Sequence, residues 1–275
     1  MKESLVKRFA EVGLRLKIME EPANLRPRDR VFGGGRRGFS IDIRERGTPR
    51  EHFIISWGSN IKNIQVLGTK PEVRHLVLFV ETEDPIQDVV KREMVNGRMT
   101  NFVHERARPA RAKRRFLCGY DEREYFVAAL PSSSTATTVD QAFRDLKPGP
   151  VLISGGKQSG TLRQGEWFLI PAPNFNPAGR AVLRNEPLVR QGGGKPHMAS
   201  QLVRTGGKSI KFEVGERLPD GRIATRAQVM TENPDVFITG TLRHPDHKTK
   251  KLQGWYRVLA NTETSPDGRV MRFFD

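Results

Sequence analysis

Residues 73–80 read Val-Arg-His-Leu-Val-Leu-Phe-Val, and they end a series of four short apolar segments. The other three segments are Phe39–Ile43, Phe53–Trp57 and Ile64–Leu67. Short turns that contain Gly, Pro or Asn separate them. Strands at this spacing are typical of an antiparallel meander with one buried face. We therefore predict a meander in the N-terminal part of the chain.

Helical spacing is found on both sides of this series. In Lys2–Val12, apolar residues recur every three or four positions, which predicts a helix that ends at Gly13. Asp84-Pro85 is typical of a helix start, so we predict a short helix over Ile86–Met94. A third helix is predicted over Val139–Leu146, and Pro148 and Gly149 would end it.

The C-terminal part has a strand pattern almost throughout. Two Pro-Asp-Gly turns, at Pro219 and Pro266, mark hairpins, because Pro presets φ and Gly accepts a positive φ. Eight short strands with turn signals predict a β-barrel or β-sandwich. The candidate strands are Val151–Ser154, Thr161–Ile170, Met198–Arg204, Ser209–Val214, Arg222–Met230, Val236–Leu242, Trp255–Ala260 and Val270–Phe274.

The predicted fold class is therefore α+β, predominantly antiparallel β. We expect an α+β domain over residues 1–148, with a meander and two or three helices, and an all-β domain over residues 149–275. Apolar runs such as Leu76–Val80 fall far short of the roughly 20 residues that a membrane span requires. One cysteine, Cys118, excludes a disulfide framework within the chain. With no pattern of an export signal, we expect a cytoplasmic protein.

The charge is strongly positive. The 275 residues carry 47 Lys and Arg against 31 Asp and Glu, a formal net charge of +16. Such an excess attracts polyanions, chiefly nucleic acid. Residues 106–115 concentrate it, with six basic residues in ten, although a solvated linker or pairing with the acidic segment Glu81–Asp88 are alternatives. The predicted nucleic-acid contacts are Arg36, Arg37, Arg106, Arg108, Arg111, Lys113, Arg114, Arg115, Lys157, Lys195 and Lys208.

Two glycine-rich stretches imitate nucleotide-binding motifs without the right context. Gly33, Gly35 and Gly38 have the bare spacing of a dinucleotide fingerprint, but a strand pattern follows where a helix is required. Gly207-Lys208-Ser209 matches the end of a Walker A loop, but Leu202 stands where its first glycine belongs. Neither stretch supports a nucleotide-dependent enzyme.

The histidines offer a different chemistry. His244-Pro245-Asp246-His247 places two imidazoles and a carboxylate around a turn, so His244, Asp246 and His247 are candidate metal ligands. Together with His197, the two turn histidines are also candidate catalytic residues for acid–base cleavage. A polar turn with two surface histidines remains the plain alternative.

Three function classes follow from these features. The leading hypothesis is a weakly sequence-specific nucleic-acid-binding protein with a basic face, in a ribonucleoprotein or a mobile-element system and without a required cofactor. The second is a histidine-dependent phosphodiester hydrolase, with a divalent metal or with acid–base catalysis. The third is a subunit of a larger assembly with an acidic protein partner. The sequence does not decide between RNA and DNA or define the oligomeric state.

Overall fold

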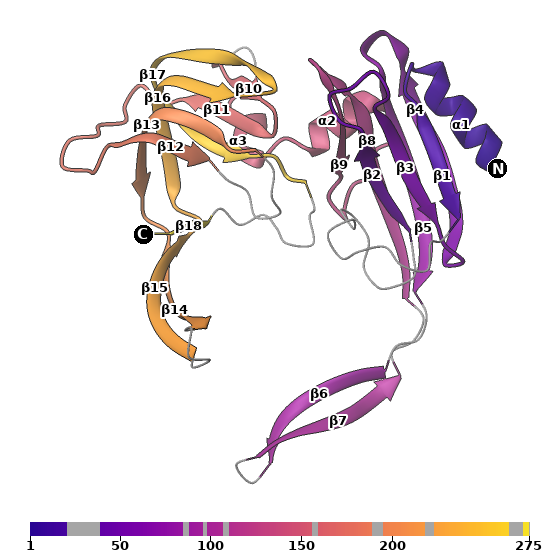
Figure 1. Ribbon diagram of the computed structural model, residues 1–275. Coiled ribbons are helices and arrows are strands. Elements are labelled where there is room, and N and C mark those ends of the chain that lie inside the picture. Colours follow the sequence, from indigo (N-terminus) through magenta and orange to yellow (C-terminus); the bar gives the residue numbers. More distant parts are fainter. Residues whose placement is uncertain are drawn as a thin grey trace. The chain divides into compact units, whose positions relative to one another are not determined.

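The computed structural model describes residues 1–20, 39–84, 88–95, 98–106, 110–155, 159–188, 195–217, 223–263 and 272–274. Strands make up 55% of the model and are mostly antiparallel, which confirms a β-rich α+β fold. The chain forms two compact units, Met1–Phe143 and Arg144–Asp275 (Figure 1). No helix within the described ranges combines the length and the hydropathy that crossing a membrane requires.

The first unit distributes its strands over three sheets. Their orders are β1-β3-β2, β4-β5-β8-β9 and β6-β7. The predicted strand series is thus divided between two sheets, and β1 runs parallel to β3. The elements are α1 (Lys2–Glu11), β1 (Leu16–Glu20), β2 (Ser40–Arg44), β3 (His52–Trp57), β4 (Ile61–Lys70), η2 (Pro71–Val73), β5 (His75–Asp84), β6 (Asp88–Val95), β7 (Arg98–Arg106), β8 (Ala110–Asp121), β9 (Glu124–Ala129) and α2 (Val139–Asp145).

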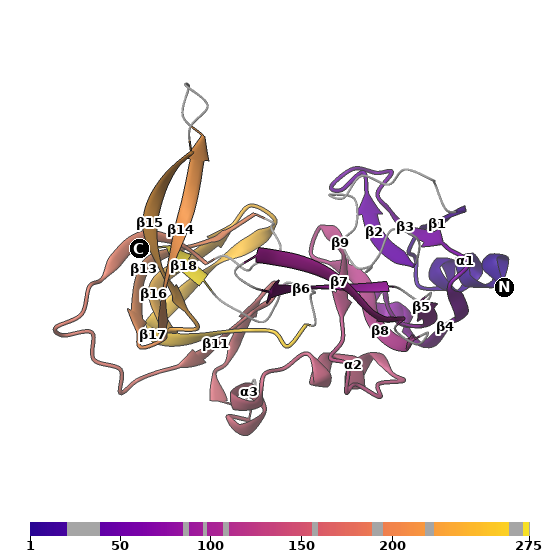
Figure 2. The same ribbon diagram turned by 90° about the horizontal axis from the view of Figure 1, so that it is seen from below.

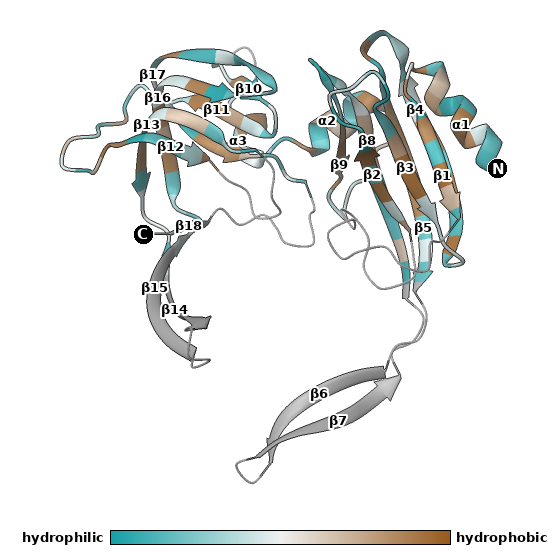
Figure 3. Cartoon of the chain, viewed as in Figure 1, coloured by the Kyte–Doolittle hydropathy of each residue, from teal (hydrophilic) through white to brown (hydrophobic). Residues whose placement is uncertain are grey.

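The core of the first unit lies between α1 and the sheets. Helix α1 lies against β1 and β4 (Figures 1 and 2) and buries Leu5 and Phe9. Phe9 meets Phe53 of β3 edge to face, with ring centroids 5.5 Å apart. Strand β1 carries both apolar and polar residues (Figure 3), and its first residue, Leu16, is buried while Lys17 is exposed, as expected for a strand with one covered face. Cys118 of β8 is fully buried in this core, and burial raises the pKa of its thiol far above the usual range.

The helix predicted over Ile86–Met94 is wrong in its described part. There the chain forms β6, which pairs antiparallel with β7 from Asp88↔Arg106 to Val95↔Arg98. The β-branched pair Val89-Val90 favours a strand, and an Asn-Gly dipeptide, the strongest short hairpin signal, separates the two strands in sequence.

The second unit has a six-stranded antiparallel sheet in the order β10-β11-β17-β16-β13-β12 and a three-stranded sheet in the order β14-β15-β18. Its apolar cluster includes Trp167, Leu202, Ile238 and Val258. The elements are α3 (Gly149–Ile153), β10 (Leu162–Gln164), β11 (Trp167–Pro171), β12 (Leu183–Leu188), β13 (His197–Thr205), β14 (Lys208–Arg217), β15 (Ile223–Glu232), β16 (Asp235–His244), β17 (His247–Ala260) and β18 (Arg272–Phe274).

Two strand predictions in the second unit are wrong. Residues 151–153 lie in the short helix α3 and Ser154 is its C-cap. Pro150 occupies the first turn of this helix, where a missing N–H costs nothing. Thr161–Ile170 is divided into β10 and β11 by a turn at Gly165, whose φ is +56°. The predicted domain boundary near residue 148 falls at the N-cap of α3, close to the division between the two units.

Candidate metal centre

Three histidines meet at one end of the six-stranded sheet, on neighbouring strands. His244 ends β16 and His247 begins β17, and the two residues pair directly across the Pro245-Asp246 turn. Met198 of β13 pairs with Arg243, so His197, one residue earlier, comes level with His244. Residues directly opposite in an antiparallel ladder project from the same face of the sheet. The sheet order therefore brings together residues that are distant in sequence.

The three rings are in mutual contact. Ring centroids are 4.1 Å apart for His197 and His244, 4.8 Å for His244 and His247, and 5.6 Å for His197 and His247. One nitrogen from each ring can be chosen so that all three lie within 4.8 Å of one another. We call these residues the three-histidine cluster. It includes His197, which the sequence analysis proposed as a catalytic residue together with the two histidines of the turn.

His197 is the buried member of the three-histidine cluster. Its residue is 1% exposed, and neither ring nitrogen has a hydrogen-bond partner. Burial, followed by the neighbouring His244 and His247, lowers the pKa of His197 to about 3, against a weaker opposing effect of Asp246. The ring is therefore neutral at physiological pH and keeps a lone pair that a cation can use.

His244 is oriented by the strand beside it. Its Nε2 lies 3.1 Å from the carbonyl oxygen of Lys195, and the backbone N–H of Asp246 donates to its Nδ1 at 3.2 Å. A carbonyl can only accept, so Nε2 carries the proton. The single lone pair of Nδ1 accepts from the Asp246 N–H, so a metal bound at Nδ1 would replace that hydrogen bond. A hydrogen bond from the non-ligating ring nitrogen to a backbone carbonyl is the usual support for a metal-binding histidine.

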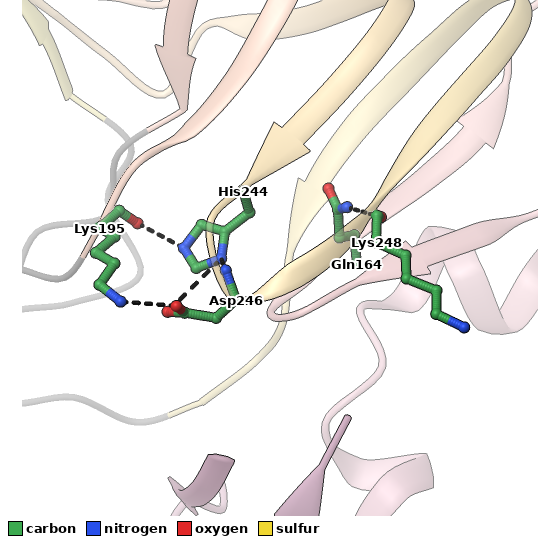
Figure 4. A network of polar contacts seen from close by, with 5 residues as sticks. All are labelled: Gln164, Lys195, His244, Asp246 and Lys248. Carbon is green, nitrogen blue, oxygen red and sulfur yellow. Dashed lines mark hydrogen bonds and ion pairs between the residues drawn. The ribbon is translucent and has the colours of Figure 1, made fainter. Parts of the chain in front are cut away.

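Asp246 lies at the turn outside the three-histidine cluster. Lys195 Nζ donates to its carboxylate at 2.7 Å, while His244 Nδ1 is 3.9 Å from the other oxygen (Figure 4). Burial alone would raise the pKa of Asp246, but Lys195 and the two turn histidines outweigh it and lower that pKa. The predicted ligand set of His244, Asp246 and His247 thus differs from the set that the fold brings together. Lys195 binds Asp246 at the turn, and the third group of the cluster is the imidazole of His197.

The turn between β10 and β11 also borders the three-histidine cluster. A Cβ atom added at Gly165 would lie 3.0 Å from His247 Nε2 and 3.3 Å from His197 Nε2. The neighbouring Gln164 donates from Nε2 to the carbonyl oxygen of Lys248, at 2.6 Å (Figure 4). Sequence reasoning missed both residues. A glycine inside a strand pattern is a signal of a turn or a close approach, and Gly165 is both.

The donor set matches a borderline transition cation. Imidazole suits zinc, copper, iron and nickel, whereas magnesium and calcium require oxygen ligands. In a tetrahedral zinc site with Zn–N bonds of about 2.0–2.1 Å, two nitrogens lie about 3.4 Å apart. The nitrogens of the three-histidine cluster, which lie within 4.8 Å of one another, would close by at most about 1.4 Å to reach that spacing. Three protein ligands leave a fourth position open for water or substrate, which is the pattern of catalytic zinc sites.

The predicted phosphate-binding residues are dispersed. Arg111, Lys113, Arg114 and Arg115 lie on β8, where Arg111 and Lys113 face Glu83 and Glu81 of β5. Arg111 Nε is 3.7 Å from Glu83, and Arg115 Nη1 donates to the carbonyl oxygen of Ser134 at 2.7 Å. This part of the basic run is therefore a strand of the sheet and no linker, and pairing with the acidic segment is present at Arg111.

The remaining predicted contacts have different positions. Lys195 pairs with Asp246, Lys208 is an exposed residue at the start of β14, and Arg106 ends β7. Arg36, Arg37, Arg108 and Lys157 lie outside the described residues. Sequence reasoning overlooked a second basic group, which is close to the histidines in sequence. Residues 243–251 hold four basic residues and one acid. This basic rim consists of Arg243, Lys248, Lys250 and Lys251.

Comparisons of the chain with protein-family models, with curated proteins and with solved structures give no match. The functional argument therefore depends on the geometry of the site.

Proposed function

We propose that the protein is a phosphodiester hydrolase that acts on nucleic acid, and that the three-histidine cluster holds its catalytic divalent cation. One observation carries the proposal: the nitrogens of His197, His244 and His247 approach one another within 4.8 Å. The unpartnered nitrogens of His197 support it, because a fully buried imidazole without any hydrogen bond is rare in folded proteins. Zinc is the cation class that this donor set favours.

The basic rim supports a phosphodiester substrate. Lys248 is exposed and directly follows His247, whereas Arg243 precedes His244 on β16 and so projects from the opposite face of that strand. Lys251 is also exposed and lies three residues after Lys248 on β17. Exposed cations near a metal site raise the local concentration of a polyanion and can contact its phosphates.

The reaction uses one water molecule. A bound divalent cation supplies Lewis acidity, which polarises a phosphoryl oxygen and lowers the pKa of a bound water. The water oxygen forms a bond to phosphorus, one phosphorus–oxygen ester bond breaks, and the leaving oxygen ends with a proton. The histidines hold the site, Lys195 and Asp246 keep the turn closed, and the basic rim positions the backbone of the substrate.

The test combines metal content with cleavage. The purified chain is loaded with zinc(II), its metal content is measured, and hydrolysis of single- and double-stranded DNA and RNA is followed. We expect about one zinc per chain and metal-dependent cleavage, and loss of both in His247→Ala. His75→Gln is the matched control, since His75 is a buried histidine of the first unit outside the cluster. Unchanged hydrolysis by His247→Ala would exclude the proposal, and zinc binding without hydrolysis would exclude the phosphodiesterase part of it.

A second candidate function is nucleic-acid binding without catalysis, through β8. Arg111 and Lys113 are exposed on this strand and project from one face of it, which favours contact with a phosphate backbone. The logarithm of the affinity would then fall linearly with the logarithm of the salt concentration. Replacing both residues with alanine should reduce the slope by about one for each contact removed. A chain that binds neither DNA nor RNA at low salt would refute this function.

The finer features of the fold and setting are part of the same proposal. The six-stranded antiparallel sheet with one apolar cluster supports a barrel or sandwich in the second unit. The free, buried thiol of Cys118 supports a reducing, cytoplasmic setting. An acidic protein partner remains an alternative use of the basic residues, and co-purification would identify it.

A further inference from the structure

Unsatisfied polar atoms collect around the three-histidine cluster. Within the described part of the chain, buried side-chain atoms without a hydrogen-bond partner include Gln164 Oε1, Trp167 Nε1 and both ring nitrogens of His197. These residues are 3%, 0% and 1% exposed. Nearly all buried polar groups in folded proteins have a partner. Several orphaned atoms at one place therefore indicate a polar ligand that they share.

Gln164 is held in one orientation beside the cluster. Its Nε2 lies 2.6 Å from the carbonyl oxygen of Lys248, the residue that follows His247 (Figure 4). A carbonyl can only accept, so this contact identifies which end of the amide is nitrogen. The orphaned atom is therefore the oxygen Oε1, which accepts hydrogen bonds and donates none.

Two neighbours of Gln164, one in sequence and one across the hairpin, approach a histidine of the cluster. Gly165 follows it in sequence and approaches His247 and His197 so closely that a Cβ would stand 3.0 Å and 3.3 Å from their Nε2 atoms. Trp167 pairs with Gln164 across the β10–β11 hairpin, and its ring meets that of His197 edge to face at 6.4 Å. The residue that carries the unmet acceptor thus lies between two residues that approach the three-histidine cluster.

A water molecule on a divalent cation is a strong O–H donor, because the cation increases its acidity. We propose that Gln164 is a positioning residue whose Oε1 accepts a hydrogen bond from the metal-bound water of the three-histidine cluster. This inference rests on the proposed metal centre. The acceptor would fix the direction of one O–H bond and so leave a lone pair of the water oxygen for attack on phosphorus. Sequence reasoning gave Gln164 no role.

The test uses cobalt(II) alone, whose visible absorption reports both the ligand set and the deprotonation of a bound water. Spectra of the cobalt-loaded full chain are recorded from acidic to alkaline pH, for the wild type, Gln164→Met and Gln164→Glu. Methionine removes the acceptor at similar length, so the transition should move to lower pH, because the water form loses its partner. Glutamate keeps an acceptor and adds a negative charge, so the transition should rise by about one pH unit.

Opposite displacements in the two variants are the signature of this role. Gln201→Met and Gln201→Glu are the matched controls, because Gln201 is an exposed glutamine on β13 of the same sheet. Circular dichroism verifies that each variant is folded. If one Gln164 variant does not fold, the direction of the displacement in the other still tests the role. Transitions that stay at the wild-type pH, or that move together, would overturn the inference. A changed spectrum of Gln164→Met at low pH would also overturn it, since Gln164 would then be a ligand. A wild-type chain that binds no cobalt would instead refute the metal centre itself.

Discussion

Both units of the molecule bury histidines, and the surroundings of those histidines differ. In the first unit, His75 of β5 packs between the rings of Phe126 and Phe143, at centroid distances of 5.3 and 5.4 Å. His52 of β3 has its Nδ1 2.8 Å from the carbonyl oxygen of Arg50. In the second unit, His197 is surrounded by two further imidazoles and has no hydrogen bond at either nitrogen.

The difference separates packing from function. Aromatic rings around His75 and a backbone carbonyl at His52 are neighbours that the chain itself supplies. Nδ1 of His75 is also buried without a hydrogen bond, so the contrast lies in the two further imidazoles around His197 and in both of its nitrogens being orphaned. The ring of His197 lies against two further imidazoles, which compete with it for a proton or a cation. An arrangement that the chain leaves incomplete is the better indication of an external ligand. Four predictions test this contrast.

The largest expected effect is stabilisation by metal. A ligand that binds only the folded state at 100 times its dissociation constant adds about 2.7 kcal/mol to the free energy of unfolding. We expect zinc(II) to stabilise the wild type and His75→Gln in urea denaturation followed by circular dichroism, and to leave His197→Gln unchanged. Equal stabilisation of His197→Gln would show that zinc binds elsewhere.

The second effect concerns space at the site. Gly165→Ala should abolish zinc binding, because the new Cβ would stand 3.0 Å from His247 Nε2. The substitution also strains a backbone with φ of +56°, at about 1 kcal/mol. Gly179→Ala is the matched control, with φ of +75° and open space around the added Cβ. Titration calorimetry should show binding by the control, and binding by Gly165→Ala would contradict the assigned position of the site.

The third effect is a dependence of stability on pH in the metal-free protein. The pKa of His197 is about 3 in the fold, against an ordinary value of 6.5. Between these values the unfolded chain binds more protons, so the free energy of unfolding falls as the pH falls below 6.5. We expect His197 to account for a loss on the order of 1 kcal/mol at mildly acidic pH.

His197→Gln removes the titrating group, so its unfolding free energy in the presence of a chelator should fall less steeply with acid than that of the wild type. Urea denaturation at neutral and mildly acidic pH measures both slopes. Parallel slopes would mean that the imidazole of His197 is protonated as easily in the folded as in the unfolded chain. The surroundings of His197 would then have no effect on its protonation.

Part of the candidate site could be predicted from local sequence. Pro245-Asp246 is turn chemistry between two strand patterns, and it places His244 and His247 opposite each other. His197 could be proposed but not placed, because its position depends on β13 pairing with β16, and no local pattern encodes sheet order. Gln164 and Gly165 were missed because Thr161–Ile170 has the alternation of one strand, and the turn at Gly165 divides it.

The fold was predictable to a similar degree. The strands of the first unit follow from period-two apolar patterns, but their division between sheets and the parallel pairing of β1 with β3 depend on tertiary packing. The helix prediction for Ile86–Met94 failed because a helix start signal competed with two β-branched residues and the Asn-Gly pair. The basic run was predicted to be an exposed phosphate-binding segment, but part of it is strand β8. There Lys113 and Arg111 lie opposite Glu81 and Glu83 of β5.

The smallest expected effect belongs to that basic run, where the chain supplies its own partners. Arg111 lies 3.7 Å from Glu83, which Lys62 also contacts at 2.7 Å. An exposed ion pair contributes about 0.2–1 kcal/mol and weakens with salt. Because Lys62 remains, Arg111→Ala should change the free energy of unfolding by no more than about 0.5 kcal/mol at low salt and by less at high salt. Denaturation at both salt concentrations measures it. A loss of several kcal/mol would mean that the basic strand is as incomplete without its ligands as the three-histidine cluster, and the contrast between the two units would fail.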